Sequence, residues 1–174
     1  TLGESAFSNC QKLNGRLVFP KKVTEIPSNS FLNCKALNFL ELGDSVKEIG
    51  ENAFKNCYNL TGNLKLTNSI EILGSSAFSN CSNLTISIVI SDKLTEIKPY
   101  TFFRCNGLTS VQFSNSIEHI QEYSFYECIG LTEIAFTDNL ESISEYAFYS
   151  CFKASKITFK DKVTEISHNA FAYT

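Results

Sequence analysis

A cysteine recurs every 23 or 24 residues along this chain of 174 residues, and a phenylalanine stands three residues before each one. The cysteines are Cys10, Cys34, Cys57, Cys81, Cys105, Cys128 and Cys151. The phenylalanines are Phe7, Phe31, Phe54, Phe78, Phe102, Phe125 and Phe148, with an eighth, Phe171, followed by Thr174 where a cysteine would stand. A fixed period of this length is typical of arrays in which each unit packs only on its neighbours. The period therefore predicts a single repeat domain over residues 1–174.

Each unit follows one pattern of apolar residues between its cysteine and the next phenylalanine. In one unit these residues are Leu108, Val111, Phe113, Ile117 and Ile120. Alternation with period two around Val111 predicts a short strand, and the Val-Thr-Glu-Ile segment at 23–26 predicts a second extended stretch. The spacing of phenylalanine and cysteine, i and i+3, predicts a single helical turn that packs inward. Stacked units would then rise by about 4.8 Å each.

These units resemble the BspA-like, or Treponema pallidum type, leucine-rich repeat, whose pattern is similar to I-x-x-x-A-F-x-x-C-x-x-L-x-x-[IV]-x-[IFL]. The resemblance covers nearly the whole chain, in about seven units of which both terminal ones are incomplete. It implies an α/β solenoid: a right-handed array with a parallel strand ladder on its concave face and short helical turns that carry the Phe and Cys columns. Incomplete end units also lead us to expect a fragment or a processed product.

The usual asparagine of leucine-rich repeats is largely missing from these units. Ser45, Ser116 and Lys162 stand at its position, and only Asn139 conforms. We therefore expect no continuous asparagine ladder and an inward place for the cysteine column. Two interpretations of that column are open. Stacked cysteines about 5 Å apart lie within disulfide range, but an identical position in every unit favours reduced thiols in a buried column.

Composition and motifs argue against several classes of function. With 43% apolar residues, 19% charged residues and a net charge of -3, the chain has no basic excess for nucleic acid. No apolar run is long enough for direct membrane insertion. No two cysteines lie closer than 23 residues, His119 and His168 occupy different columns, and no phosphate-binding glycine loop occurs. We expect no metal, no cofactor and no enzyme activity.

Two surfaces are candidates for binding. The first is the outward side of the predicted concave strand face, a set of mixed chemistry: Arg16, Val18, Phe39, Glu41, Lys65, Val89, Gln112, Glu133, Lys156 and Thr158. The second is an aromatic stripe that flanks the core phenylalanines of the last three complete units, where earlier units have mostly small polar residues: Tyr100, Phe103, Tyr123, Tyr126, Tyr146 and Tyr149, with Phe152 nearby. The stripe is either a contact surface or a set of rings that stack laterally and stiffen the array.

The resemblance also implies a role. BspA-like repeats are typical of surface or secreted proteins of host-associated bacteria and protists, where they are implicated in attachment to host matrix proteins and to other microbes. The first hypothesis is therefore a non-enzymatic protein-binding module of an adhesin. An intracellular interaction scaffold is the alternative, because oxidising compartments usually pair their cysteines. Self-association through the ends or the aromatic stripe is open as well.

Overall fold

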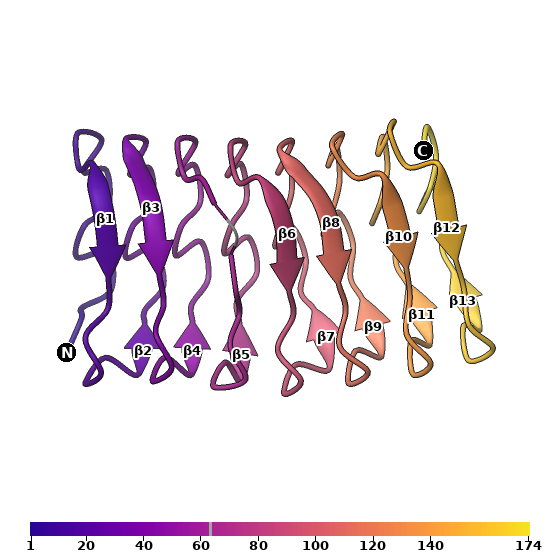
Figure 1. The fold of residues 1–174 in the computed structure, drawn as a ribbon, viewed down its shortest axis with the longest axis horizontal. Coiled ribbons are helices and arrows are strands. Elements are labelled where there is room, and N and C mark those ends of the chain that lie inside the picture. Colours follow the sequence, from indigo (N-terminus) through magenta and orange to yellow (C-terminus); the bar gives the residue numbers. More distant parts are fainter. Residues whose placement is uncertain (63) are drawn as a thin grey trace.

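The structure is a computed structural model that describes residues 1–62 and 64–174 as a parallel-strand solenoid of about seven turns (Figure 1). The longer strands lie on one face: β1 (Gly15–Val18), β3 (Leu37–Glu41), β6 (Ile86–Val89), β8 (Leu108–Gln112), β10 (Glu133–Ala135) and β12 (Lys156–Thr158). Two-residue strands form a second row: β2 (Glu25–Ile26), β4 (Glu48–Ile49), β5 (Ile72–Leu73), β7 (Glu96–Ile97), β9 (His119–Ile120), β11 (Ser142–Ile143) and β13 (Glu165–Ile166). Asn63, which falls on the strand-face pattern, lies outside the described residues.

Within each sheet the neighbouring strands are parallel and come from successive coils, so equivalent repeat positions form columns. Arg16 pairs with Phe39 and Val18 with Glu41, and in the second row Ile97, Ile120 and Ile143 stand in line. In the described part of the chain, the row of longer strands consists of the pairs β1–β3, β6–β8 and β10–β12, and a bridge joins Lys65 to Val89. The second row divides into β2–β4–β5 and β7–β9–β11–β13. Both predicted extended stretches are confirmed.

The predicted helical turn around each phenylalanine is wrong, since the described residues form consecutive turns there and contain no helix. In the fifth unit the backbone N–H groups of Tyr100, Phe102 and Arg104 donate to carbonyls of the next coil at 3.1, 2.8 and 2.8 Å. These N–H groups are therefore not available for bonds within a helix. The backbone closes the turns through left-handed residues two before and two after the phenylalanine, with φ of 58° at Tyr100 and 55° at Arg104.

The phenylalanine column forms a continuous stack in the centre of the solenoid. Neighbouring rings lie nearly parallel with centroids 5.3 Å apart for Phe31–Phe54 and 5.9 Å for Phe78–Phe102. From Phe31 to Phe148 every ring of the column is buried. The prediction that all eight phenylalanines and all seven cysteines are core is wrong at the ends. Phe7 is 41% exposed, Cys10 is exposed and Phe171 is half-buried, because their coils have a neighbour on one side only.

The cysteine column is buried and reduced from Cys34 to Cys151, as the second interpretation predicts. The sequence did not show why cysteine recurs. The thiol of Cys105 donates to the carbonyl of Phe78 in the preceding coil, with Sγ and O 3.2 Å apart, and Cys34 to Cys151 all make the equivalent bond at 3.1 to 3.4 Å. Thr174 makes the same bond to Phe148 through its hydroxyl at 2.7 Å. The position therefore requires a small side chain with a donor.

Burial also makes these thiols unreactive. It raises the pKa of Cys57, Cys105 and Cys151 to about 12, and that of Cys34 to about 11, from an ordinary value of 9.0. Because the thiolate is the reactive form, the native protein should expose one fast thiol, Cys10, to a disulfide-exchange reagent at pH 7.5. The denatured chain should expose all seven. Several fast thiols in the native protein would contradict the buried column.

Candidate binding surfaces

The outer positions of the longer strands carry ion pairs near both ends of the face. Arg16 donates to Glu41 at 2.9 Å, and its guanidinium lies 4.2 Å from the centroid of the Phe39 ring. At the other end Lys156 pairs with Glu133 at 2.6 Å. All four charged side chains remain about half exposed or more, so these pairs contribute little to stability. The ion pairs do, however, hold these side chains in place on the surface that a partner would contact.

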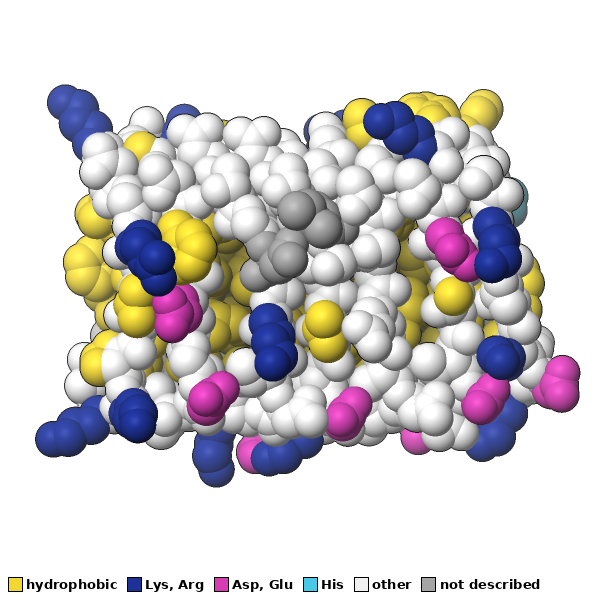
Figure 2. Space-filling model, viewed as in Figure 1, with side chains coloured by type: hydrophobic (Ala, Val, Ile, Leu, Met, Phe, Trp, Pro, Cys, Tyr) yellow, Lys and Arg dark blue, Asp and Glu magenta, His cyan; other side chains and the backbone are white. Residues whose placement is uncertain are grey.

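Between these pairs the face is hollowed. A groove of about 460 Å³ lies between β8 and β10, with Val111, Phe113 and Ala135 among its lining residues and Gln112 and Glu133 beside them. A second hollow, of about 300 Å³, adjoins Phe39, Leu40 and Lys65. Figure 2 shows apolar side chains on the floor of this face, between polar ridges. The face thus offers small apolar hollows within a polar surround, the arrangement that protein side chains fill at interfaces. Val89 and Thr158 are half-buried and Val18 is 50% exposed, all on this face.

The aromatic stripe forms two parallel rows of stacked rings. Tyr100, Tyr123 and Tyr146 make the first row, with centroids 4.9 and 5.0 Å apart. The second row is made by Phe103, Tyr126 and Tyr149, with centroids 5.1 and 5.0 Å apart. Lateral stacking is therefore confirmed, and whether the stripe also binds stays a prediction.

Neighbouring rings determine which residues belong to the stripe and shift the pKa of one of its tyrosines. Phe152 is 65% exposed, and in the described part of the chain no ring of the stripe contacts it. Tyr173, which the sequence did not single out, packs edge-on against Tyr149 at 5.3 Å. Partial burial, followed by the neighbouring tyrosines, raises the pKa of Tyr123.

The tyrosines of the first row occupy left-handed backbone positions. Their φ values are 58°, 56° and 57°, a region that bulky residues disfavour and that asparagine tolerates. The other five units place asparagine or serine there: Ser5, Asn29, Asn52, Ser76 and Asn169. Three consecutive units therefore carry tyrosine although the backbone there favours asparagine. Folding alone does not explain these tyrosines, and a role in binding is a hypothesis to test.

Replacing Tyr100, Tyr123 and Tyr146 together with asparagine should leave the free energy of unfolding within about 2 kcal/mol of the parent. The variant loses two stacks within the row and three ring contacts with the second row, at about 0.5–1.5 kcal/mol each. Relief of left-handed strain at the three positions returns about 1–2 kcal/mol each. Urea denaturation followed by circular dichroism measures the difference. A loss much above this range would mean that the row is needed for the fold.

An asparagine ladder is present, at a different repeat position from the usual leucine-rich-repeat one. Asn33, Asn56 and Asn80 each donate from Nδ2 to Oδ1 of the asparagine one coil earlier, at 2.8, 2.7 and 2.8 Å, beginning at Asn9. The expectation of no ladder considered only the usual leucine-rich-repeat position. The column just before each cysteine already contains these four asparagines in the sequence, so the signal was available. The ladder ends where Arg104 follows Asn80, because Arg104 bonds to Glu127 at 2.9 Å instead.

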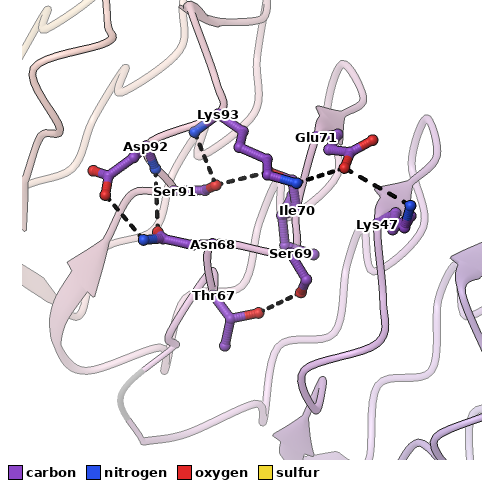
Figure 3. A network of polar contacts seen from close by, with 9 residues as sticks. All are labelled: Lys47, Thr67, Asn68, Ser69, Ile70, Glu71, Ser91, Asp92 and Lys93. Carbon is purple, nitrogen blue, oxygen red and sulfur yellow. Dashed lines mark hydrogen bonds and ion pairs between the residues drawn. The ribbon is translucent and has the colours of Figure 1, made fainter.

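A polar network joins three coils beside the interruption of the short-strand row (Figure 3). Glu71 accepts a hydrogen bond from Lys93 at 2.6 Å and lies 3.9 Å from Lys47, and these lysines lower the pKa of its carboxyl. Asn68 donates to Asp92 at 2.9 Å in the same region. The charged side chains of this network therefore all have a partner within it.

The two histidines do not come together. Nδ1 of His119 lies 2.9 Å from the Ser142 hydroxyl, whereas exposed His168 meets the edge of Tyr146. Across residues 1–62 and 64–174, no three histidine, cysteine or acidic side chains are grouped so that they could hold a metal ion. Helices long and apolar enough for a membrane span are likewise absent from the described chain.

Comparison with known families agrees with this column structure. The family model of the BspA type leucine rich repeat region matches the chain in six copies, over residues 1–106 and 85–174. The chain belongs to this family. BspA-type repeats have a leucine-rich-repeat fold, which is generally a non-enzymatic protein-interaction module. A search among curated proteins found no match.

Three solved bacterial structures resemble the chain. A leucine rich cell surface protein from Faecalibacterium prausnitzii is 30% identical, with a TM-score of 0.78 over 92% of this chain and 42% of that one. A leucine-rich repeat protein from Eubacterium ventriosum shares the fold at 22% identity, with a TM-score of 0.81 over 92% and 43%. A leucine rich repeat protein of T. pallidum is 25% identical, with a TM-score of 0.55 over 74% and 69%. This chain spans less than half the length of the first two.

Proposed function

We propose that the chain is a non-enzymatic protein-binding segment of a microbial cell-surface or secreted protein, and that it contacts host matrix proteins or other cells through the strand face. The observation that carries this proposal is the groove between β8 and β10, where apolar residues lie among polar ones at the break between two pairs of strands. The similar F. prausnitzii protein, named as a cell surface protein, supports the location. The six buried cysteines do not favour an intracellular scaffold over this role, because burial protects their thiols in either compartment.

Binding of the purified chain to immobilised fibronectin, laminin and collagen tests the proposal. A Gln112→Lys, Ala135→Lys variant places two cations beside the groove, at exposed strand positions that leave the core untouched. An Asn115→Lys, Asn139→Lys variant is the matched control, since it adds the same charge outside the lining of the groove.

We expect the parent and the control to bind at least one of the three proteins, and the groove variant to bind it at least tenfold more weakly. Equal binding by both variants would exclude the groove as the contact. Binding of none of the three, nor of intact host cells, would contradict the adhesive role.

A further inference from the structure

A hollow of about 360 Å³ lies on the turn side of the solenoid, where the asparagine ladder ends and the aromatic rows begin. It is lined by Lys55, Ser76, Ser79, Asn80, Tyr100 and Phe103. The strand face plays no part in it, and neither does the proposed adhesive function. Its two walls differ in chemistry, because one coil contributes serine and asparagine where the next contributes aromatic rings.

The aromatic wall consists of the first rings of the two stacked rows. Tyr123 covers one face of Tyr100 and Tyr126 covers one face of Phe103. The preceding coil places Ser76 and Ser79 at the equivalent positions, so no ring of that coil stacks on them. Tyr100 is 37% exposed. The rows thus end at the hollow in an aromatic surface that inner members such as Tyr123 cannot offer.

The polar wall carries hydrogen-bonding groups that the described chain leaves unused. Asn80 donates along the ladder to Asn56, but no side chain donates to its own Oδ1 in turn, because Arg104 is bonded to Glu127. Donation by the Asn80 amide strengthens its oxygen as an acceptor. Among the described residues, the hydroxyls of Ser76 and Ser79 have no hydrogen-bond partner, although Ser79 is only 2% exposed, and Lys55 has no ion-pair partner.

We propose that this hollow binds a neutral hexopyranose unit of a glycan. A pyranose ring has a face of weakly positive C–H groups, which suits the negative face of an aromatic ring. Its rim of hydroxyls both donates and accepts, and so matches a free amide oxygen, two serine hydroxyls and an ammonium group. Bound in this way, the sugar stacks on Tyr100 and donates a hydroxyl to Oδ1 of Asn80.

Other ligand classes fit the hollow less well. A purely apolar segment would leave Asn80 and the serines unsatisfied, which costs binding free energy. An anion would find Lys55 as its single cation among the lining residues. The sugar is the class whose apolar face and polar rim match both walls.

The test is isothermal titration and saturation-transfer NMR with glucose, galactose, mannose and N-acetylglucosamine and their di- and trisaccharides. The key variants are Tyr100→Asn and Asn80→Ala. The asparagine keeps the residue that other units use at that left-handed position. Tyr146→Asn is the matched control, since it makes the same change at the far end of the same row, away from the hollow.

We expect at least one saccharide to bind the parent and the control alike, and to bind each key variant about tenfold more weakly. Circular dichroism of every variant shows that the fold is kept. Absence of binding by all these saccharides at millimolar concentration would overturn the proposal. Unchanged binding by folded Tyr100→Asn would overturn it as well. None of these outcomes depends on binding to matrix proteins.

Discussion

Replacing Phe102 with alanine is expected to lower the free energy of unfolding by about 3–5 kcal/mol. The ring is fully buried and stacks on Phe78 at 5.9 Å and on Phe125 at 5.3 Å, so its removal opens a cavity between two coils. Because each coil contacts only its neighbours, the cavity also weakens the coupling between the two halves of the array. Urea denaturation should therefore give both a lower midpoint and a broader transition.

Phe7→Ala is the matched control for this experiment. Phe7 belongs to the same column but is 41% exposed and has one stacked neighbour, Phe31 at 5.2 Å. It should lose no more than about 1.5 kcal/mol, since little cavity remains when a half-exposed ring is removed. Equal losses at the two positions would mean that the column does not form the core.

The second large effect is loss of stability in alkali. The pKa of the thiols of Cys57, Cys105 and Cys151 is raised to about 12 by burial, against 9.0 for the ordinary thiol. Above pH 9 the unfolded chain loses these protons while the folded chain keeps them, so stability that is fully present below pH 9 falls as pH rises toward 12. Each such thiol removes about 1.4 kcal/mol per pH unit in this window. Three thiols together remove about 4 kcal/mol per unit, a large part of the stability of an ordinary domain.

Urea denaturation at pH 8, 9, 10 and 11 under reducing conditions measures this slope. The control is the triple variant with threonine at positions 57, 105 and 151. Threonine does not ionise, and Thr174 already makes the same hydrogen bond to the preceding coil. The variant should show a slope smaller by about 4 kcal/mol per pH unit between pH 10 and 11. Identical slopes would show that ionisation of the thiols is not coupled to unfolding.

The spacing of apolar residues was sufficient to predict the solenoid, its columns and both extended stretches. The prediction succeeds because parallel stacking gives equivalent positions of successive coils the same environment. A buried position such as Phe54 therefore has the same residue type one coil later, at Phe78. The conformation of the turns could not be predicted in the same way. Phenylalanine and cysteine three residues apart suit a helical turn and a pair of turns equally well. The bonds that decide between them run to the next coil, as from the Phe102 N–H to Ser124.

The candidate site shows a similar division. The aromatic stripe was visible in the sequence, because residue types at one repeat position change abruptly between Ser76 and Tyr100. Its geometry was not visible, since the ring faces that remain open depend on stacking across coils. The unused oxygen of Asn80 was hidden for another reason. The Asn80 oxygen has no donor because Arg104 bonds to Glu127 and not to Asn80. The sequence alone does not show which of these two partners Arg104 takes.

Hydroxyl-radical footprinting in the presence of the matrix protein that binds best tests most directly that the strand face is the binding surface. The side chains that report on this face are Val18, which is 50% exposed, Val89, which is half-buried, and Val111, which lines the groove between β8 and β10. Ile72 and Ile166, 44% and 49% exposed on the short-strand row, are the internal controls. We expect the partner to protect Val89 and Val111 from oxidation and to leave Ile72 and Ile166 unchanged. Protection of the two isoleucines with unchanged oxidation of the valines would contradict it.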